Sequence, residues 1–349
     1  MSLRAIYGHR ALLNRLEGAL TSSRFPQSAL FTGPAGVGKQ RLALWVAQGL
    51  LCAEGTGAPC CQCSQCRQVD GLVHPDLHWL TPIARPKATD PAKQIEDAQE
   101  LLAGAMAERR DGLWGHPEGM VSHPLASIRL LQRIASKTPF SGARKVIVVG
   151  DAEWLVVQES SPEAANALLK LLEEPPADTT IIVTAADPQR LLPTIRSRLV
   201  TLRVAPVGDQ TVREFLENEQ DPAPKGAALE RAVLLAEGAV GRAIGTDRNP
   251  VDDARAERFL AAVGRGDSAW LPTVLGQAPW SARGDFTAFL DSLALNLRTR
   301  VEERANDSRE ATRGIRALRH VEQAREEAQG NVNPQLTLAV LAADLEALV

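Results

Sequence analysis

Aromatic side chains, excess charge of one sign and long apolar runs are all scarce in this sequence. Aromatic residues make up 4% of the 349 residues, and the formal net charge is −3. The first value leaves few stacking platforms for single-stranded nucleic acid, and the second argues against a surface that binds polyanions in general. No apolar run approaches the ~20 residues that cross a bilayer, and the first residues lack the apolar core of a signal peptide. We therefore expect a cytoplasmic protein without a membrane partner.

The composition is otherwise that of an ordinary globular protein. Hydrophobic residues make up 44% of the chain and charged residues 23%. A chain of 349 residues favours two or three domains over a single core. The search for function therefore turns from composition to local motifs.

The most informative stretch is a glycine-rich loop at 33–40, which follows the apolar run 29–31 and precedes the apolar-periodic segment 42–51. A strand, a glycine loop and a helix in this order are what a phosphate-binding loop requires. The glycines let backbone N–H groups turn toward phosphate oxygens, and the helix N-terminus adds partial positive charge. A glycine-rich turn without a ligand is the alternative. The candidate nucleotide-binding residues here are Gly33, Gly36, Val37, Gly38, Lys39 and Gln40.

Two positions differ from the residues that bind Mg²⁺ in a magnesium-dependent P-loop hydrolase. The loop ends in Gln40, where Ser or Thr normally offers a hydroxyl to Mg²⁺, an ion that demands near-ideal octahedral oxygen geometry. The buried-type strand 145–149 is followed by Gly150, at the place of the metal-holding Asp, and by Asp151, at the place of the neighbouring Glu. Because both departures concern the same ion, we expect productive Mg²⁺ binding and hydrolysis to be lost. Backbone N–H groups and Lys39 remain to hold ATP or ADP without productive metal, and that question stays open.

The cysteines form a second motif. In a reducing cytoplasm, cysteines favour metal ligation over disulfides. The spacing predicts a closed, structural four-thiolate Zn²⁺ site in a module at 52–66, with unmetallated thiols as the alternative. Cys61 has no place in that spacing, although it could stand in for Cys60, and His74 is expected to be a turn or packing residue rather than a fifth ligand. The expected ligands are Cys52, Cys60, Cys63 and Cys66.

The rest of the chain predicts three regions. Strands and helices alternate across the loop over 1–204, which predicts an α/β domain with a parallel sheet; Thr184 ends one strand, at the edge where such sheets gather ligands. Residues 82–127 look like a surface insertion around one helical stretch, and no function is assigned to them. Residues 205–248 read as a small helical unit, a linker is expected at 247–252, and apolar residues recur at helical spacing over 252–349.

Taken in order, these motifs resemble the bacterial clamp-loader subunits of the AAA+ class. The resemblance implies an AAA+ P-loop domain with an inserted zinc module, a small helical lid domain and a C-terminal all-α collar domain that holds a pentameric ring together. The matching pieces, besides the loop and the cysteine module, are the segments 74–76, 138–140, 165–170, 172–176, 194–198, 238–243 and 331–336.

The resemblance also implies residue roles and partners. Arg198 falls in the family's Ser-Arg-Cys motif, which ends here in Leu199, and is the expected arginine finger that reaches a neighbouring subunit's ATP. Thr184 and Arg242 fall at the sensor-1 and sensor-2 positions. The family loads a ring-shaped sliding clamp on primer–template DNA for DNA polymerase III, so the implied partners are gamma/tau and delta subunits in a hetero-pentamer, the clamp and DNA. A surface arginine in a salt bridge is the alternative for Arg198.

Three functions therefore compete. The first is a non-hydrolysing clamp-loader subunit that supplies Arg198 in trans. The second is an active ATPase motor of the gamma/tau type, which shares most of the motifs, and the third is a nucleotide-sensing scaffold outside replication. Gln40 and Gly150 favour the first over the second, and nothing in the sequence demands the third.

Overall fold

The computed structural model divides into two compact units, Met1–Ile244 and Gly245–Val349. It describes residues 5–110, 121–141, 144–156, 162–220, 222–243, 250–266, 268–279, 285–304, 307–328 and 332–348. The helical lid expected at 205–248 thus falls in the first unit as far as it is described. Most of the linker expected at 247–252 lies outside the described residues.

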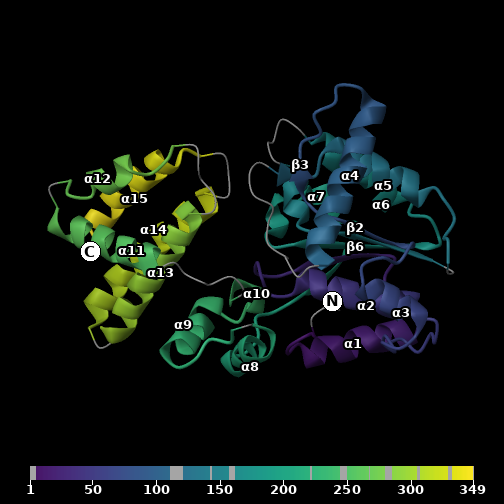
Figure 1. The fold of residues 1–349 in the computed structure, drawn as a ribbon, viewed down its shortest axis with the longest axis horizontal. Helices are drawn as coiled ribbons and strands as arrows, with labels where there is room; N and C mark the ends of the chain where they lie inside the picture. Colours follow the sequence, from purple (N-terminus) through teal and green to yellow (C-terminus); the bar gives the residue numbers. More distant parts are fainter. Residues whose placement is uncertain are drawn as a thin grey trace. The chain divides into compact units, whose positions relative to one another are not determined.

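The first unit is built on a five-stranded parallel sheet with the strand order β2-β5-β6-β1-β7 (Figure 1). The three central strands are buried at every position, which explains the apolar runs at their centres. The two edge strands are shorter and more mixed in composition, and the sequence analysis did not predict them. The strands are β1 (Ser28–Thr32), β2 (Leu77–Leu80), β5 (Lys145–Val149), β6 (Thr179–Ala185) and β7 (Val200–Arg203).

Helices cover both faces of this sheet (Figure 1). Alternate residues of a strand point to opposite faces, so Phe31 packs with one helical layer and Leu30 with the other. The layer on the Phe31 side consists of α1 (Arg10–Thr21), α2 (Lys39–Leu51) and α3 (Ser64–Asp70). The layer on the Leu30 side consists of α4 (Pro91–Arg110), α5 (Leu125–Ala135), α6 (Glu163–Glu173) and α7 (Pro193–Arg196).

Short elements complete the first unit. The 82–127 segment contributes α4 and an antiparallel pair, β3 (Ile83–Ala84) and β4 (Val121–Ser122). Two 3-10 turns, η1 (Ala152–Leu155) and η2 (Pro188–Arg190), follow β5 and β6. Three lid helices enclose a small core of their own, against which Tyr7 packs edge-on at 5.2 Å from Phe215. These helices are α8 (Asp209–Glu219), α9 (Ala227–Ala236) and α10 (Val240–Ala243).

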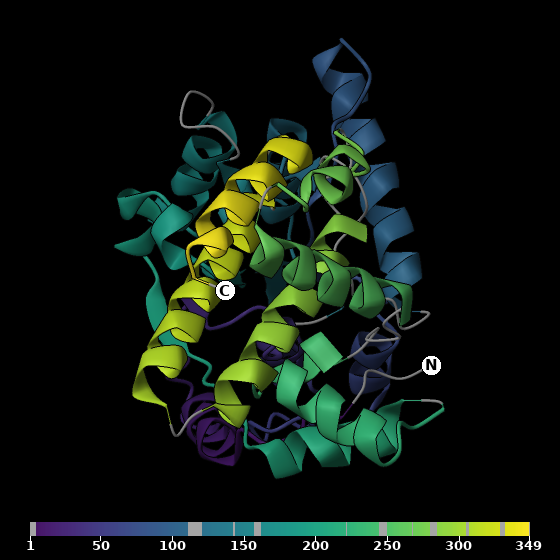
Figure 2. The same ribbon diagram turned by 90° about the vertical axis from the view of Figure 1, so that its left-hand side faces the viewer.

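Within the described residues of the second unit, every element of regular structure is a helix, as expected for 252–349 (Figure 2). Its helices pack around a separate core in which Phe259 meets Phe289 edge-on at 5.6 Å. Among the described residues of the whole chain, none of the helices is both long and apolar enough to cross a bilayer. The helices of this unit are α11 (Pro250–Arg265), α12 (Leu271–Leu275), α13 (Asp285–Glu303), α14 (Ser308–Ala328) and α15 (Pro334–Glu346).

Asp76 fixes the segment that enters β5. Its buried carboxylate accepts hydrogen bonds from the backbone N–H of Phe140 at 2.6 Å and from the N–H and hydroxyl of Ser141, both at 2.8 Å. Burial alone would raise the pKa of Asp76, but these hydrogen bonds outweigh it and hold the pKa below its ordinary value. His74 accepts the N–H of Asp76 at 3.0 Å, which confirms that this histidine is a turn and packing residue.

We predict that Asp76→Ala lowers the free energy of unfolding of the first unit by about 3 kcal/mol, because the charge-assisted hydrogen bonds of a buried carboxylate are lost. A carboxyl with a depressed folded-state pKa stabilises above its unfolded pKa of about 4 and loses that contribution as the pH falls through the folded value. The difference in free energy of unfolding between wild type and variant should therefore become smaller at acid pH. Urea denaturation at several pH values measures it. Asp90→Ala, which removes the carboxylate that caps α4, is the control, and we expect it to lower the free energy of unfolding by about 1 kcal/mol. Equal decreases for the two variants would contradict the prediction.

Candidate functional site

The glycine-rich loop joins β1 to α2 at the carboxyl edge of the sheet. Gly36 and Gly38 have φ angles of 79° and 95°, a region that residues with a Cβ rarely adopt. Gly38 is the N-cap of α2, so Lys39 and Gln40 are the first two residues of the helix. The first amide groups of a helix have no intrahelical acceptor. The loop therefore has the backbone form that a phosphate-binding loop requires.

The lid contacts the tip of this loop. The Gly241 N–H donates to the Gly36 carbonyl at 2.8 Å, and a Cβ on Gly36 would lie 2.8 Å from the Arg242 nitrogen. The side chain of Arg242 pairs with Glu237 at 2.5 Å. Its charge is also one of the influences that lower the pKa of Lys39, after burial. The structure thus brings Arg242 to the loop, where sensor 2 was expected.

Lys39 turns back into its own loop. Its ammonium group is buried and donates to the carbonyl oxygens of Gly33 and Pro34, both at 2.8 Å. Burial lowers the pKa of Lys39, and the nearby carboxylates of Glu153 and Asp151 oppose that shift. These contacts occupy two of the three N–H donors of Lys39. On the other side of the loop, the ring nitrogen Nε2 of His9 lies 3.1 Å from the carbonyl oxygen of Val37, a contact that the sequence analysis did not find.

Gln40 fills the position from which Ser or Thr would reach Mg²⁺. Its Nε2 donates to Asp151 Oδ2 at 2.8 Å, and its Oε1 accepts from Trp79 Nε1 and Arg109 Nη1, both at 3.1 Å. A Cβ on Gly150 would lie 2.7 Å from Gln40 Oε1, so an Asp at this position requires the Gln40 side chain to leave its hydrogen bonds. Magnesium requires octahedral oxygen ligands at about 2.0–2.1 Å. The residues present do not fit that ion, and the two departures predicted separately form one packing arrangement.

The ends of β5 and β6 meet beside the loop. The Asp151 N–H donates to Thr184 Oγ1 at 3.1 Å, so the expected sensor-1 hydroxyl lies at this site. Glu153 was not singled out from the sequence, yet it is only 6% exposed. Its Oε1 accepts the Ala186 N–H at 3.0 Å, while its buried Oε2 has no hydrogen-bond partner among the described residues. Burial and the neighbouring Asp151 raise the pKa of Glu153 to about 7.

Arg109 also escaped the sequence analysis as a site residue. It comes from α4, in the 82–127 segment that was expected to be a surface insertion, and it is buried. A signal was present in the sequence. The buried residues Ile95, Ala98 and Leu102 recur at helical spacing, and Arg109 lies seven positions after Leu102 on the same face. A cation that continues an apolar stripe indicates a buried charge.

Arg198 is placed differently, between α7 and β7. Its side chain is 35% exposed, and its Nη2 pairs with Glu173 Oε1 at 2.6 Å. Its Nη1 donates to the Thr194 carbonyl at 2.8 Å. The buried Leu199 occupies the place of the cysteine in the family motif. These two contacts hold the guanidinium of Arg198 at the end of α6 with one side open to solvent.

The four predicted cysteine ligands lie together. Their sulfur atoms are all within 4.8 Å of one another, and those of Cys60 and Cys66 are 3.9 Å apart. A tetrahedron with Zn–S bonds of about 2.3 Å places sulfurs about 3.8 Å apart. The N–H groups of Cys63 and Cys66 point at the sulfurs of Cys60 and Cys63, each at 3.3 Å. The group, which includes Cys52 and leaves out Cys61 and His74, could hold a metal ion such as zinc.

Comparison with known proteins places this geometry in a family. The family model described as "DNA polymerase III, delta subunit" matches residues 8–208. The DNA polymerase III subunit delta' of Bacillus subtilis is 31% identical over 62% of this chain and 54% of its own length. That of Pseudomonas aeruginosa is 31% identical over 66% and 57%, and subunit tau of Escherichia coli is 28% identical over 68% and 31%. The chain thus matches little more than half of the delta' relatives and under a third of tau.

We predict that the cysteine group holds one zinc ion per chain and that removing it destabilises the first unit. A ligand that binds only the folded state raises stability by RT ln(1 + [L]/Kd). Cys63→Ser should lose most of the bound metal and lower the midpoint of thermal unfolding. Elemental analysis and thermal unfolding with and without a chelator measure both effects. Cys61→Ser is the matched control, and equal loss of metal in both variants would argue against the ligand set.

We predict that Glu153→Gln becomes more stable than the wild type as the pH rises from about 5 to 8. A carboxyl with a raised folded-state pKa stabilises the fold fully below its unfolded pKa of about 4.3 and loses that contribution as the pH rises through the folded value. With a folded pKa of about 7, the difference at pH 8 is on the order of 3 kcal/mol. Denaturant titration across this pH range measures it. Glu174→Gln changes an exposed carboxyl and is the control, with the same dependence of unfolding free energy on pH as the wild type. A difference in unfolding free energy between Glu153→Gln and the wild type that does not change with pH would refute the prediction.

Proposed function

Because this chain belongs to the family described as DNA polymerase III, delta subunit, we propose that it acts as a delta'-type clamp-loader subunit that does not itself hydrolyse ATP. Its task is to help open the sliding clamp and place it on primer–template DNA, with gamma/tau and delta subunits as its neighbours in the ring. The carboxamide of Gln40 against Gly150 carries the proposal. Hydrolysis by this class of fold needs a hydroxyl and a carboxylate on magnesium at these two positions.

In this proposal Arg198 acts on a neighbour's nucleotide. A guanidinium placed against the γ-phosphate stabilises the charge of the transferring group and supplies about 10³–10⁵ in rate, or roughly 4–7 kcal/mol of barrier. The partial exposure of Arg198 supports this role, because a finger must leave its own subunit's surface. Its ion pair with Glu173 is a surface contact worth about 0–1 kcal/mol. A phosphate can therefore displace Glu173 at small cost.

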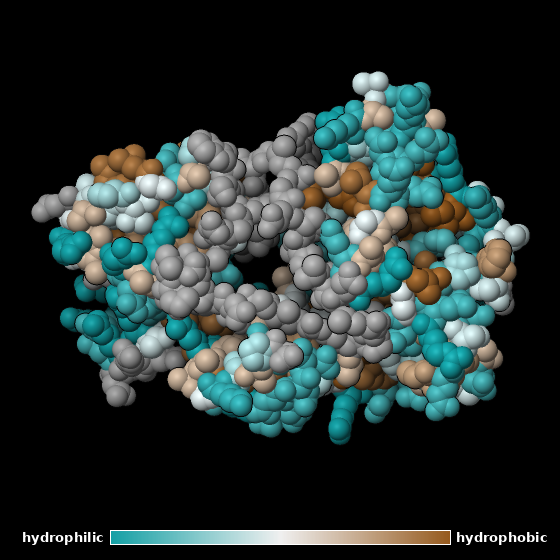
Figure 3. Space-filling model, viewed as in Figure 1, coloured by the Kyte–Doolittle hydropathy of each residue, from teal (hydrophilic) through white to brown (hydrophobic). Residues whose placement is uncertain are grey.

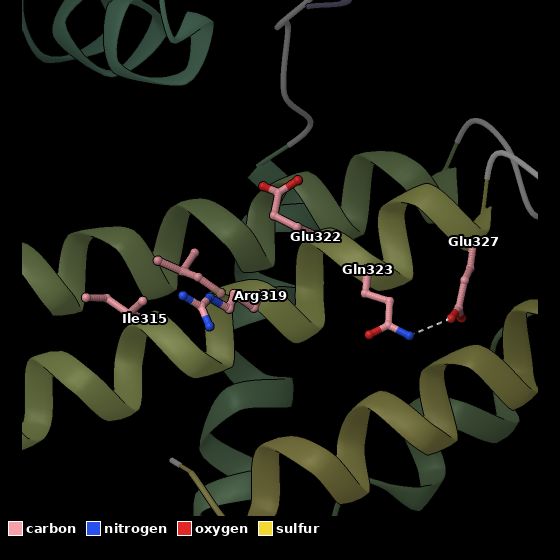
Figure 4. A pocket seen from close by; sticks show the side chains of 6 residues that line it. Ile315, Arg319, Glu322, Gln323 and Glu327 are labelled. Carbon is pink, nitrogen blue, oxygen red and sulfur yellow. Dashed lines mark hydrogen bonds between the residues drawn. The ribbon is translucent and has the colours of Figure 1, made fainter. Parts of the chain in front are cut away.

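The second unit is proposed to be the collar that holds the ring together. Exposed apolar residues support this proposal, because such residues mark surfaces that bind other proteins when they cluster. Figure 3 shows an apolar patch over α12, where Leu271 and Leu275 are exposed. A shallow groove along α14, lined by Ile315 and Arg319 among others, lies on the same unit (Figure 4). Leu336 and Val340 are also exposed, on α15.

An ATPase motor of the gamma/tau type is the second candidate. The identity of 28% to the tau subunit of Escherichia coli is the observation in its favour. The chemistry at the phosphate loop supports the first candidate instead, since Mg²⁺-dependent turnover requires ligands that Gln40 and Gly150 do not offer. Turnover by the isolated chain is therefore the measurement that separates the two.

We predict that the purified chain shows no Mg²⁺-dependent ATP hydrolysis above a protein-free background. In a reconstituted loader ring, Arg198→Ala should assemble normally and lose about 10³-fold or more of the turnover at one interface, so that total ATPase falls by the share of that interface. Pre-steady-state phosphate release measures the loss, and size-exclusion chromatography verifies assembly.

Arg203→Ala is the matched control, because Arg203 is an exposed arginine on the neighbouring strand β7. It should leave both assembly and turnover unchanged. Turnover by the isolated chain would favour the motor function over the proposed one. An unchanged rate for Arg198→Ala in an intact ring would remove the finger role.

A further inference from the structure

We propose that helix α4 closes the magnesium position of the phosphate loop, with the Arg109 guanidinium as a resident cation that holds the Gln40 carboxamide in the place of the ion. This assigns a role to a segment that the proposed function leaves without one. It rests on contacts within the first unit alone, so it stands or falls independently of clamp loading.

The contacts of Gln40 are the first support. A carboxamide has two N–H donors and one oxygen with two acceptor positions. Both acceptor positions of Gln40 are filled, by Trp79 Nε1 and Arg109 Nη1 at 3.1 Å each, and one donor is bound to Asp151 at 2.8 Å. With its oxygen saturated in this way, Gln40 has no lone pair to offer a metal ion.

Steric exclusion at Gly150 is the second support. A Cβ there would lie 2.7 Å from Gln40 Oε1 and 3.2 Å from Trp79 Nε1. Real Cβ atoms are not found so close to other heavy atoms, so one side must move. Gln40 Oε1 is the end of a flexible chain, but its hydrogen bonds to Trp79 and Arg109 hold it in place. A metal-binding Asp at 150 and the Gln40 network thus exclude each other.

Charge is the third support. The guanidinium of Arg109 stacks over Trp79 at 4.3 Å from the ring centre and is attracted by Asp151. Burial lowers the pKa of Arg109 to about 10, which leaves it charged at neutral pH. Asp151, which follows the metal-holding position, therefore has a fixed positive charge nearby, at the side of the loop where a hydrolase would hold its metal ion.

Described residues on both sides of Arg109 fix helix α4 and the strand that follows in sequence. Helix α4 buries Ile95, Ala98 and Leu102 in the same core as α5 and α6. The ring Nε2 of buried His123 lies 2.7 Å from the Gly150 carbonyl, and the His123 N–H donates to the Trp154 carbonyl at 3.1 Å. The segment thus contacts the residue that follows β5 from one end and Gln40 from the other.

A double-mutant cycle tests the steric part. Gly150→Ala should lower the midpoint of thermal unfolding by about 2–4 °C or more, because its Cβ breaks the Gln40 network. In a Gln40→Ala background the same substitution should cost little, so the two changes are strongly non-additive. Equal losses in both backgrounds would overturn the proposal.

Binding of Mn²⁺, a paramagnetic substitute for Mg²⁺, tests the metal part by electron paramagnetic resonance. With zinc already bound and ADP present, the wild type should bind no Mn²⁺ beyond what ADP alone binds. The triple variant Gln40→Thr, Gly150→Asp, Arg109→Ala should gain a protein-bound Mn²⁺–ADP complex that holds Mn²⁺ about 10-fold or more tightly than ADP alone does.

The matched control keeps the first two substitutions and replaces Arg109→Ala with Arg110→Ala. Arg110 is an exposed neighbour on the same helix, so this variant retains the resident cation and should bind Mn²⁺ about 10-fold or more weakly than the triple variant. Equal gains in both variants would overturn the role of Arg109. The wild-type measurement does not depend on the triple variant. A Mn²⁺–ADP complex that forms on the wild type and that Lys39→Ala abolishes would overturn the proposal even if the triple variant failed to fold.

Discussion

The carboxamide of Gln40 is the interaction on which the arrangement of the phosphate loop depends. It joins four parts of the first unit: helix α2, strand β2 through Trp79, the end of β5 through Asp151, and the 82–127 segment through Arg109. Buried polar networks are strong when every member is bonded and costly when one is removed. The loop therefore keeps its glycine geometry while its metal-binding chemistry is replaced by packing.

The charges around the loop follow from that network. Lys39 and Arg109 are buried cations, and Asp151 and Glu153 are carboxyls beside them. Arg109 attracts Asp151, and burial raises the pKa of Glu153 to about 7, so that this carboxyl carries about half of its charge at neutral pH. An anion that enters the loop meets a Lys39 ammonium group with two of its three N–H donors bound to carbonyl oxygens.

Much of this fold could be predicted from the sequence, because the local pattern of apolar residues identifies the central strands and the principal helices. The runs at 145–149 and 179–184 became β5 and β6 within one residue, and the four spaced cysteines do lie together. The edge strands β2 and β7 escaped prediction because half-exposed strands have mixed composition. Arg109 escaped for another reason: its partner Gln40 lies 69 positions away in the chain. The losses at Gln40 and Gly150 were recognised as related through an ion, but their direct contact in space has no sequence signal.

The closed loop and the proposed finger share one helical layer. Helix α4, which carries Arg109, packs with α5, α5 packs with α6, and α6 ends at Glu173, the partner of Arg198. Close-packed interiors transmit displacement from one element to the next. The bridge of Gln40 to Asp151 and Arg109 ties this layer to the loop. Under the proposed function, that bridge holds the layer in one arrangement while the neighbouring subunits bind and hydrolyse ATP. Arg198 is then presented to its neighbour from a fixed surface, and the timing of hydrolysis is left to the subunit that holds the ATP.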